Sequence, residues 1–474
     1  MSQSTSYYKR FNGLITFIRQ AIKGEDLDYT AIPMRKAIFM LAIPMVLEMI
    51  MESVFAIVDL YFVGHLPYSS QAIQTVGLTE SVLTIVYSLA IGISMAATAL
   101  VARRVGEKNN DGAATAAIHT VYIALVVVII LSIAGSYYAA DILRIMGAEK
   151  ATVEIGTPYT RIMMASSSII MLLFLINGIF RGAGDASMAM KSLWLANICN
   201  IILCPILIRG LGPIPAMGLT GAAWATTIGR GLGVIYQVYH LIKGAGVIKI
   251  LKKHLRLEWN IIKSVFKIAY PATLQFVIMS CSWIFLAKLV ADSGKDIASA
   301  GYQTALRIVM FFILPAWGLS NAATTLVGQN LGAKQPERAE RAVIKTAQYN
   351  ATFMAIVTLF FLIFPNPIVS LFTNNEQVKQ YAVEAMRIIS CGYIFYGIGM
   401  VMANAFNGAG DTWTPTWINL AGFWFFQIPL AYFLSTTLQL GPTGVFIAIP
   451  VAETAITITA FILFKKGRWK KMMI

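Results

Sequence analysis

Apolar stretches long enough to cross a lipid bilayer recur along this whole chain, for example at 120–136, 166–180 and 351–364. A membrane-spanning helix needs roughly 20 apolar residues, and in lipid only helices and closed barrels satisfy their own backbone hydrogen bonds. Charged residues make up only 12% of the 474 residues and hydrophobic residues 57%, which is not the composition of a soluble domain. The sequence therefore predicts an all-α polytopic membrane protein.

These apolar stretches predict twelve transmembrane helices joined by short loops. The expected crossings lie at about 37–63, 74–100, 115–139, 160–180, 188–208, 220–242, 265–291, 298–326, 347–365, 383–406, 413–435 and 443–464. Residues 1–36 hold several charged side chains and no apolar core followed by a cleavage site. We therefore expect a cytosolic N-terminal segment there rather than a signal peptide.

Lysine and arginine are distributed unevenly between alternate loops. If both termini are cytosolic, 27 of the 37 basic residues lie on the cytosolic side, seven on the other side and three within or near the membrane. This asymmetry is the one that the positive-inside rule describes. It accounts for the net charge of +15 without nucleic-acid binding, and it predicts cytosolic termini.

Short motifs occur twice in the chain at a nearly constant spacing. VARRVGEK (101–108) resembles VGQNLGAK (327–334), and RGAGD (181–185) resembles NGAGD (407–411), with the same offset along the chain in both pairs. GLTGAAWA (218–225) and GPTGVFIA (441–448) follow in the same order. The repeat predicts two six-helix lobes of the same orientation, related by a pseudo-two-fold axis along the membrane normal.

The repeat also gives the expected domain limits. After the N-terminal segment 1–36, we expect an N-lobe at 37–242, a basic cytosolic linker at 243–264, a C-lobe at 265–464 and a basic cytosolic tail at 465–474. The basic linker is interpreted as a connector that lies near anionic lipid head groups.

The first predicted crossing carries three carboxylates, Glu48, Glu52 and Asp59. Because a helix advances about 100° per residue, the three lie within about 40° of one face. Acids in a bilayer helix are costly unless they face water, a partner or a proton, so they indicate a functional site. Glu80, near the start of the second crossing, reaches a similar depth in the predicted hairpin.

The paired loops 101–108 and 327–334, the paired RGAGD and NGAGD loops, VDLYFVGHL at the end of the first crossing and NIILCPILI in the fifth resemble the multidrug and toxic compound extrusion (MATE) family. The resemblance covers about 35–464 and is closest to the bacterial DNA-damage-inducible-type branch. It implies a multi-pass exporter in the bacterial inner membrane. Such a protein expels organic, often cationic, compounds in exchange for H⁺ or Na⁺.

The resemblance also implies an ion site in the N-lobe. The acid that ends the first crossing in the family matches Asp59. An Asn of the fifth crossing and a Thr of the sixth match Asn200 and Thr226. The family's Asp four residues after that Asn is replaced here by Cys204, which leaves the standard site without one carboxylate.

We therefore expect Asp59, Glu52 and Glu80 to form a cation site, with Glu48 continuing it toward the cytosol. Clustered carboxylates can share a proton, and a monovalent cation such as Na⁺ at Asp59 can replace that proton. No resident cofactor or other metal is expected. The alternative is that these acids are packing groups, or line an aqueous cavity without coupling to transport.

The C-lobe presents a different set of polar residues. Acids that other family members use in this lobe fall near Met279 and Tyr396, so that version of the site is absent. Gln275, Tyr396, Arg307 and Glu453 are the candidates for lining a substrate cavity. For Arg307 and Glu453, both predicted to be embedded, a structural ion pair is the favoured interpretation.

Other functions fit the sequence less well. A lipid or glycan flippase would need basic groups for phosphate, and an intramembrane transferase would need Asp-rich metal motifs or a His/Asn pair within a crossing. We therefore expect no enzyme activity. The expected partners are small organic molecules and the bilayer, with the protein acting as a monomer. The substrates and the coupling ion remain open at this stage.

Overall fold

The structure is a computed structural model that describes residues 13, 15–244 and 246–474. The remaining parts of the predicted N-terminal segment and linker, residues 1–12, 14 and 245, lie outside the described residues. The first half contains α2 (Met34–Gly64), α3 (Ser69–Gly106), α4 (Asn110–Tyr137), α5 (Ala139–Ile145), α6 (Lys150–Ala165), α7 (Ser167–Ala183), α8 (Ala186–Arg209) and α9 (Leu219–Lys243).

The second half follows the short η1 (Lys252–Leu255). It contains α10 (Trp259–Gly332), α11 (Pro336–Ile363), α12 (Pro365–Ser370), α13 (Glu376–Ser390), α14 (Tyr393–Ala409), α15 (Trp413–Asn419), the π-helical η2 (Leu420–Gln427), α16 (Ile428–Tyr432), the π-helical η3 (Phe433–Thr437), α17 (Pro442–Lys465) and η4 (Arg468–Lys471). Each of the predicted crossings overlaps one or more of these helical segments.

The 74-residue α10 is a helical hairpin rather than one straight rod. Its backbone leaves the helical conformation at Lys295, where φ is 56°. The rings of Phe276 and Trp317 lie 5.9 Å apart, although a straight helix would separate them by roughly 60 Å. The two arms of α10 therefore correspond to the predicted crossings at 265–291 and 298–326.

Among the described residues, nine helices are long and apolar enough to cross a membrane, or ten when α13 and α14 count as one span bent by 55°. In that count α10 is a single helix, and α9 is not included. The predicted all-α polytopic membrane fold is confirmed. The number of twelve crossings stays a prediction.

The repeated sequence motifs form the same turns in both halves. Gly184 and Gly410, from RGAGD and NGAGD, end α7 and α14 with φ of 92° and 84°, a conformation in which only glycine avoids strain. The other repeated loops place Lys108 and Lys334 at φ of 58° and 59°. The sequence repeat is therefore also a repeat of backbone conformation.

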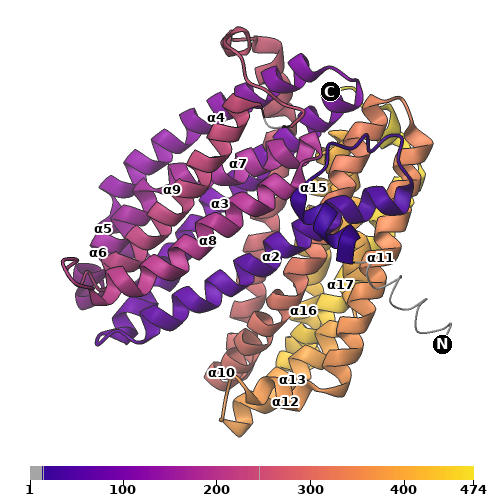
Figure 1. Cartoon of the computed structure of the whole chain (residues 1–474). Coiled ribbons are helices and arrows are strands. Elements are labelled where there is room, and N and C mark those ends of the chain that lie inside the picture. The colour runs from indigo at the N-terminus through magenta and orange to yellow at the C-terminus, as the bar shows by residue number, and fades with distance from the viewer. Residues whose placement is uncertain (1–12, 14, 245) are drawn as a thin grey trace, which may run out of the picture.

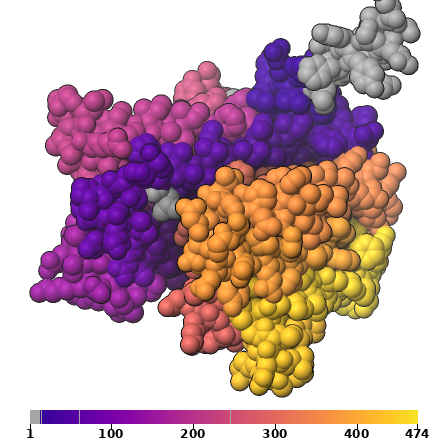
Figure 2. Space-filling view, turned by 90° about the horizontal axis from the view of Figure 1, so that it is seen from below, coloured from indigo at the N-terminus to yellow at the C-terminus, as the bar shows by residue number. Residues whose placement is uncertain are grey.

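Helices α2–α9 form one bundle, here called the N-lobe, and α10–α17 form a second, the C-lobe (Figure 1). The largest buried apolar cluster is drawn mainly from the N-lobe and the first residues of α10, whereas two others are drawn from the C-lobe alone. Seen from below, the two lobes fill separate halves of the molecule (Figure 2). Each lobe therefore has its own core.

The lobes converge at the end of the molecule that carries the C-terminus and diverge at the opposite end (Figure 1). At the convergent end, Gly106 of α3 lies against the backbone of Gln329 in α10, and Gly332 lies against the backbone of Arg103. A Cβ atom at either glycine would overlap the facing carbonyl oxygen. Small residues allow helix backbones to approach this closely, so α3 and α10 form the closed end.

Polar contacts reinforce this closed end. The Arg103 guanidinium of α3 donates to the carbonyl oxygens of Met472 at 2.9 Å and Ala409 at 3.4 Å. The Gln329 amide donates to the carbonyl oxygen of Gly182 at 3.1 Å. Each of these bonds joins the N-lobe to a residue of the second half of the chain.

Candidate functional site

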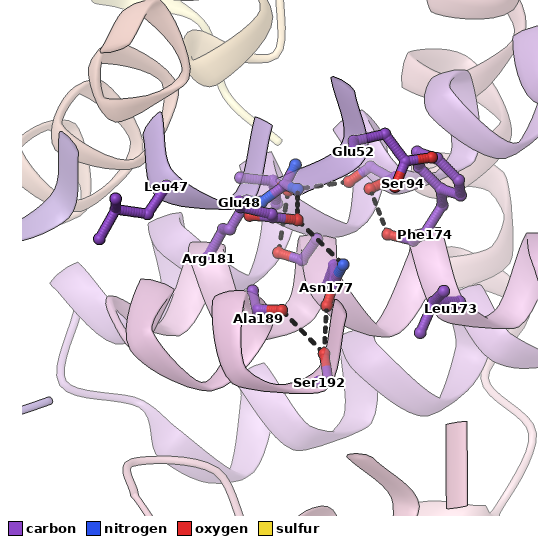
Figure 3. Close-up of polar contacts among 12 residues, drawn as sticks. Leu47, Glu48, Glu52, Ser94, Leu173, Phe174, Asn177, Arg181, Ala189 and Ser192 are labelled. Atoms are coloured by element: carbon purple, nitrogen blue, oxygen red, sulfur yellow. Dashed lines mark hydrogen bonds and ion pairs between the residues drawn. The ribbon is translucent and has the colours of Figure 1, made fainter. Parts of the chain in front are cut away.

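Glu48 lies at the centre of a buried polar network in the N-lobe (Figure 3). Its Oε1 atom accepts a hydrogen bond from Asn177 Nδ2 at 3.0 Å and forms an ion pair with Arg181. The Oδ1 atom of Asn177 in turn accepts from Ser192 Oγ at 3.0 Å and from Gln237 Nε2 at 2.6 Å. This network joins α2, α7, α8 and α9, so Glu48 has a charged partner within the protein.

Glu52, one turn further along α2, is held by a different set of groups. Its Oε2 atom accepts from Asn197 Nδ2 at 3.0 Å, and its Oε1 atom lies 3.4 Å from an Arg230 guanidinium nitrogen. Arg230 is buried, donates to the Tyr87 hydroxyl at 3.0 Å and lies over the Phe55 ring. Arg230 is therefore the cation around which this part of the site is arranged.

Asp59 lies beside the residue that replaces the family's second acid. The Cys204 thiol donates to Asp59 Oδ1 at 3.7 Å. Nearby on α8, the Asn200 amide donates to the Thr226 hydroxyl at 2.9 Å, while its own buried Oδ1 atom has no protein partner among the described residues. Asn200 and Thr226, the two residues matched to the family's site, are thus in contact, and the Asn200 carbonyl oxygen has no protein partner in the described part of the chain.

Glu80 of α3 completes the group. Its side chain is exposed, yet it lies close enough to Arg230, Asp59 and Glu52 to interact electrostatically with all three. The structure thus brings Asp59, Glu52 and Glu80 together around Arg230. Glu48 lies in the adjacent network with Arg181.

The charges of this N-lobe cluster do not balance. Four carboxylates, Glu48, Glu52, Asp59 and Glu80, face the two guanidinium groups of Arg181 and Arg230. Uncompensated carboxylates on membrane-spanning helices are costly, so the cluster is suited to take up protons or a cation. Among the described residues, no group of three or more His, Cys, Asp or Glu side chains has the arrangement of a metal site.

Five residues of this cluster were assigned no role from the sequence: Arg181, Arg230, Asn177, Asn197 and Tyr87. The sequence does contain a signal for both arginines: each lies within an apolar helix, where a basic residue needs an acidic partner. Periodicity does not reveal which acid each arginine meets, because the partners are 133 and 178 residues away in the chain.

The C-lobe holds a cavity of about 460 Å³ that also borders α3 of the N-lobe. Three of the four candidate residues, Gln275, Tyr396 and Glu453, lie on its wall. The other lining groups are mainly aromatic rings and thioethers. These are Phe276, Trp283, Trp317, Phe423, Met95, Met279, Met310 and Met400.

Arg307, the fourth candidate, is not among the residues that line this cavity. Its side chain is exposed on the second arm of α10, whereas Glu453 of α17 is only 6% exposed. The structure contains no ion pair between them in its described part, so the expected Arg307–Glu453 pair is wrong. Arg307 lies on the exposed side of its helix and Glu453 is buried, a difference that the sequence alone does not reveal.

Comparisons of the sequence and of the structure with known proteins all match the same family of proteins. The sequence profile of the MatE family matches residues 44–206 and again residues 271–433. The second match begins and ends at one constant offset from the first, so the predicted duplication is borne out. The two matched segments cover most of the chain.

Two relatives with similar sequences carry different functional names. A probable multidrug resistance protein, NorM, of Thermotoga maritima is 27% identical over 442 residues, covering 93% of this chain and 94% of that protein. An FAD transporter of Shewanella oneidensis is 25% identical over 438 residues, covering 92% of this chain and 95% of that protein.

Solved structures share the fold along nearly the whole chain. One, described as the outward-facing conformation of a multidrug resistance MATE family transporter of the MOP superfamily, has a TM-score of 0.88 and 26% sequence identity. The match covers 95% of this chain and 99% of that one.

Proposed function

The chain belongs to the MatE family of transporters, and from this premise we propose that it is a secondary active antiporter for organic, often cationic, compounds. Transport is driven by inward movement of H⁺ or Na⁺, and the two lobes give alternating access to the cavity. Ion coupling is centred on Asp59, Glu52 and Glu80, and Glu48, Asn200 and Thr226 extend the site. Multidrug efflux relatives and the transporter fold support this function over enzyme activity.

The observation that carries the proposal is the charge imbalance in the N-lobe. Four carboxylates face two guanidinium groups, and two of the acids, Asp59 and Glu80, form no ion pair with a basic side chain among the described residues. Protons or monovalent cations supply the missing positive charge. The Asn200 Oδ1 atom, which has no protein partner in the described part of the chain, is an oxygen ligand of the kind that Na⁺ uses.

The geometry of the lobes suits exchange of the site between two sides of a membrane. The lobes diverge away from the end that carries the C-terminus and are closed by α3 and α10 at that end (Figure 1). With both termini in the cytosol of a bacterial cell, this conformation faces outward. The likeness to an outward-facing transporter supports this orientation, and we propose the inner membrane as the location and a monomer as the functional unit.

The lining of the cavity distinguishes between two substrate classes suggested by the relatives. It contains Glu453 and no Lys, Arg or His side chain among the described residues. FAD carries a pyrophosphate, and a lipid or glycan flippase also handles phosphate, so each would need basic groups. The observed lining favours a cationic or neutral organic compound, and it makes the flippase and the transferase weaker alternatives.

Reconstituted protein tests the proposal directly. Ethidium efflux from proteoliposomes is measured with a pH gradient alone, with a Na⁺ gradient alone and with neither, and one gradient should accelerate efflux. Asp59→Asn and Glu52→Gln should lose this acceleration, whereas Asp141→Asn, whose partner is the neighbouring Arg144 on the short α5, serves as the control. Wild-type rates in both N-lobe variants would contradict the coupling site.

A further inference from the structure

Glu453 is the one carboxylate among the described residues on the wall of the C-lobe cavity. Its side chain is only 6% exposed, and no hydrogen bond or ion pair to it occurs in the described part of the protein. It borders both the main cavity and a small adjoining pocket that contains Trp283 and Tyr396. The carboxylate therefore faces space that a ligand can enter.

The internal repeat shows why Glu453 has no counter-charge. α9 and α17 begin after equivalent glycines, Gly218 and Gly441, whose φ angles are 56° and 57°. Arg230 and Glu453 stand at the same distance along the chain after these two glycines. The two lobes thus carry opposite charges at equivalent positions.

The residue that pairs with Arg230 in the N-lobe also has no charged equivalent in the C-lobe. In the N-lobe, Arg230 meets Glu52 of α2. When the two family matches are aligned from their first residues, the counterpart of Glu52 is Met279, which also lines the cavity. Because Met279 is uncharged, nothing in the described part of the C-lobe replaces the ion pair that neutralises Arg230.

A buried carboxylate without a protein partner is stable only when it is protonated or paired with a cation. One carboxylate balances one positive charge, and the described cavity wall offers no second acid. The aromatic walls, among them Phe276 and Trp317 with ring centroids 5.9 Å apart, favour flat rings and add cation–π attraction.

We propose that Glu453 makes this cavity selective for organic compounds that carry a single positive charge. A planar monocation places its charge at Glu453 and its rings against the aromatic walls. A dication leaves its second charge in a low-dielectric cavity without a partner, and an anion is repelled. This inference rests on the proposed export of organic compounds and deepens it, because it assigns charge selectivity to the C-lobe and ion coupling to the N-lobe.

Ethidium and propidium test the proposal, because they share one aromatic ring system but carry one and two positive charges. Binding of each to purified detergent-solubilised protein is measured by quenching of tryptophan fluorescence, without any ion gradient. Wild-type protein should bind ethidium at least about 10-fold more tightly than propidium, which corresponds to about 1.4 kcal/mol. Glu453→Gln should weaken ethidium binding about 10-fold or more and reduce this preference.

Two further variants keep the result interpretable. Glu453→Asp retains the charge and should keep the preference for ethidium. Glu384→Gln changes a C-lobe carboxylate that lies outside this cavity and accepts a hydrogen bond from the Thr443 hydroxyl at 2.6 Å. This control variant should bind both dyes like the wild type. A melting curve for each protein establishes that it is folded.

The proposal is wrong if folded Glu453→Gln binds ethidium like the wild type, or if wild-type protein binds propidium as tightly as ethidium. If the wild type shows gradient-driven efflux but Glu453→Gln leaves dye binding unchanged, this inference is overturned and the proposed function stays intact. Charge-selective binding without gradient-driven efflux would support the inference while contradicting the proposed function.

Discussion

The two lobes share one sequence repeat and the same turns, yet their interiors are opposite in character. The N-lobe holds Glu48 and Glu52, which hydrogen bonds and ion pairs link to Arg181, Arg230 and buried amides, and it places Asp59 and Glu80 beside them. The C-lobe interior holds a mostly apolar cavity with a single carboxylate among its described lining residues. The difference shows that the two halves keep the same backbone frame, while changes at a few interior positions give an acidic cluster in one lobe and a mostly apolar cavity in the other.

Helix α2 and the first arm of α10 show these changes most directly. When the two family matches are aligned from their first residues, Glu48 corresponds to Gln275 and Glu52 corresponds to Met279. Asp59 corresponds to Leu286, which is buried in the C-lobe core. Because the acids are replaced by neutral residues, the equivalent helix can line an apolar cavity instead of an ionic cluster.

The largest expected effect follows from removing the cation of the N-lobe. Arg230→Met leaves Glu52 without its ion-pair partner, and breaking a buried pair in this way costs about 3–5 kcal/mol. We expect a strong fall in thermal stability in detergent and a loss of gradient-driven ethidium efflux. The double variant Arg230→Met with Glu52→Gln should regain part of the stability.

Arg307→Met is the matched control for this experiment, because Arg307 is exposed and forms no ion pair within the described chain. It should melt and transport like the wild type. Wild-type stability and transport in Arg230→Met would mean that the N-lobe cluster does not depend on its central cation.

The second prediction concerns Glu48 and its own arginine. Glu48→Gln keeps a hydrogen-bond acceptor for Asn177 but leaves the Arg181 charge unpaired, at an expected cost of about 1–3 kcal/mol. Thermal melting measures the loss. The double variant Glu48→Gln with Arg181→Met should melt closer to the wild type than the single variant does, and an equal or larger loss in the double variant would contradict the pairing.

A third experiment makes the C-lobe resemble the N-lobe. Met279→Glu places a carboxylate at the counterpart of Glu52 and gives the cavity a second negative charge. Propidium affinity should rise by about 5-fold to 10-fold relative to ethidium affinity, because the second positive charge gains a partner. Fluorescence quenching measures both. An unchanged ratio in Met279→Glu, with Met279→Gln as the neutral control, would contradict charge matching in the cavity.

The smallest expected effect lies where the lobes meet. Arg103→Ala removes bonds to the carbonyl oxygens of Met472 and Ala409, each contributing about 0.5–1.5 kcal/mol to the closed end. Spin labels at the exposed positions Tyr138 and Leu371 should report a broader distance distribution between the lobes. Arg104→Ala, which removes only a local bond to Glu107, should leave the distribution unchanged.

Much of the fold follows from local patterns. Apolar runs predict the helices because a bilayer helix must be apolar over its whole length, and the repeated motifs predict two similar lobes. The repeated glycines at 184 and 410 indicate tight helix ends because few other residues adopt a positive φ. Helical periodicity likewise predicts that Glu48, Glu52 and Asp59 share one face of α2.

The sequence by itself therefore determined that this is a duplicated helical membrane protein with acids in its first helix. The tertiary structure decided that Glu48 meets Arg181, that Glu52 meets Arg230 and that Arg307 does not pair with Glu453. These pairings depend on how distant helices are rotated and packed against each other, which no local pattern encodes. The charge selectivity proposed for the C-lobe rests on the same packing, because packing alone brings one buried carboxylate to an aromatic cavity.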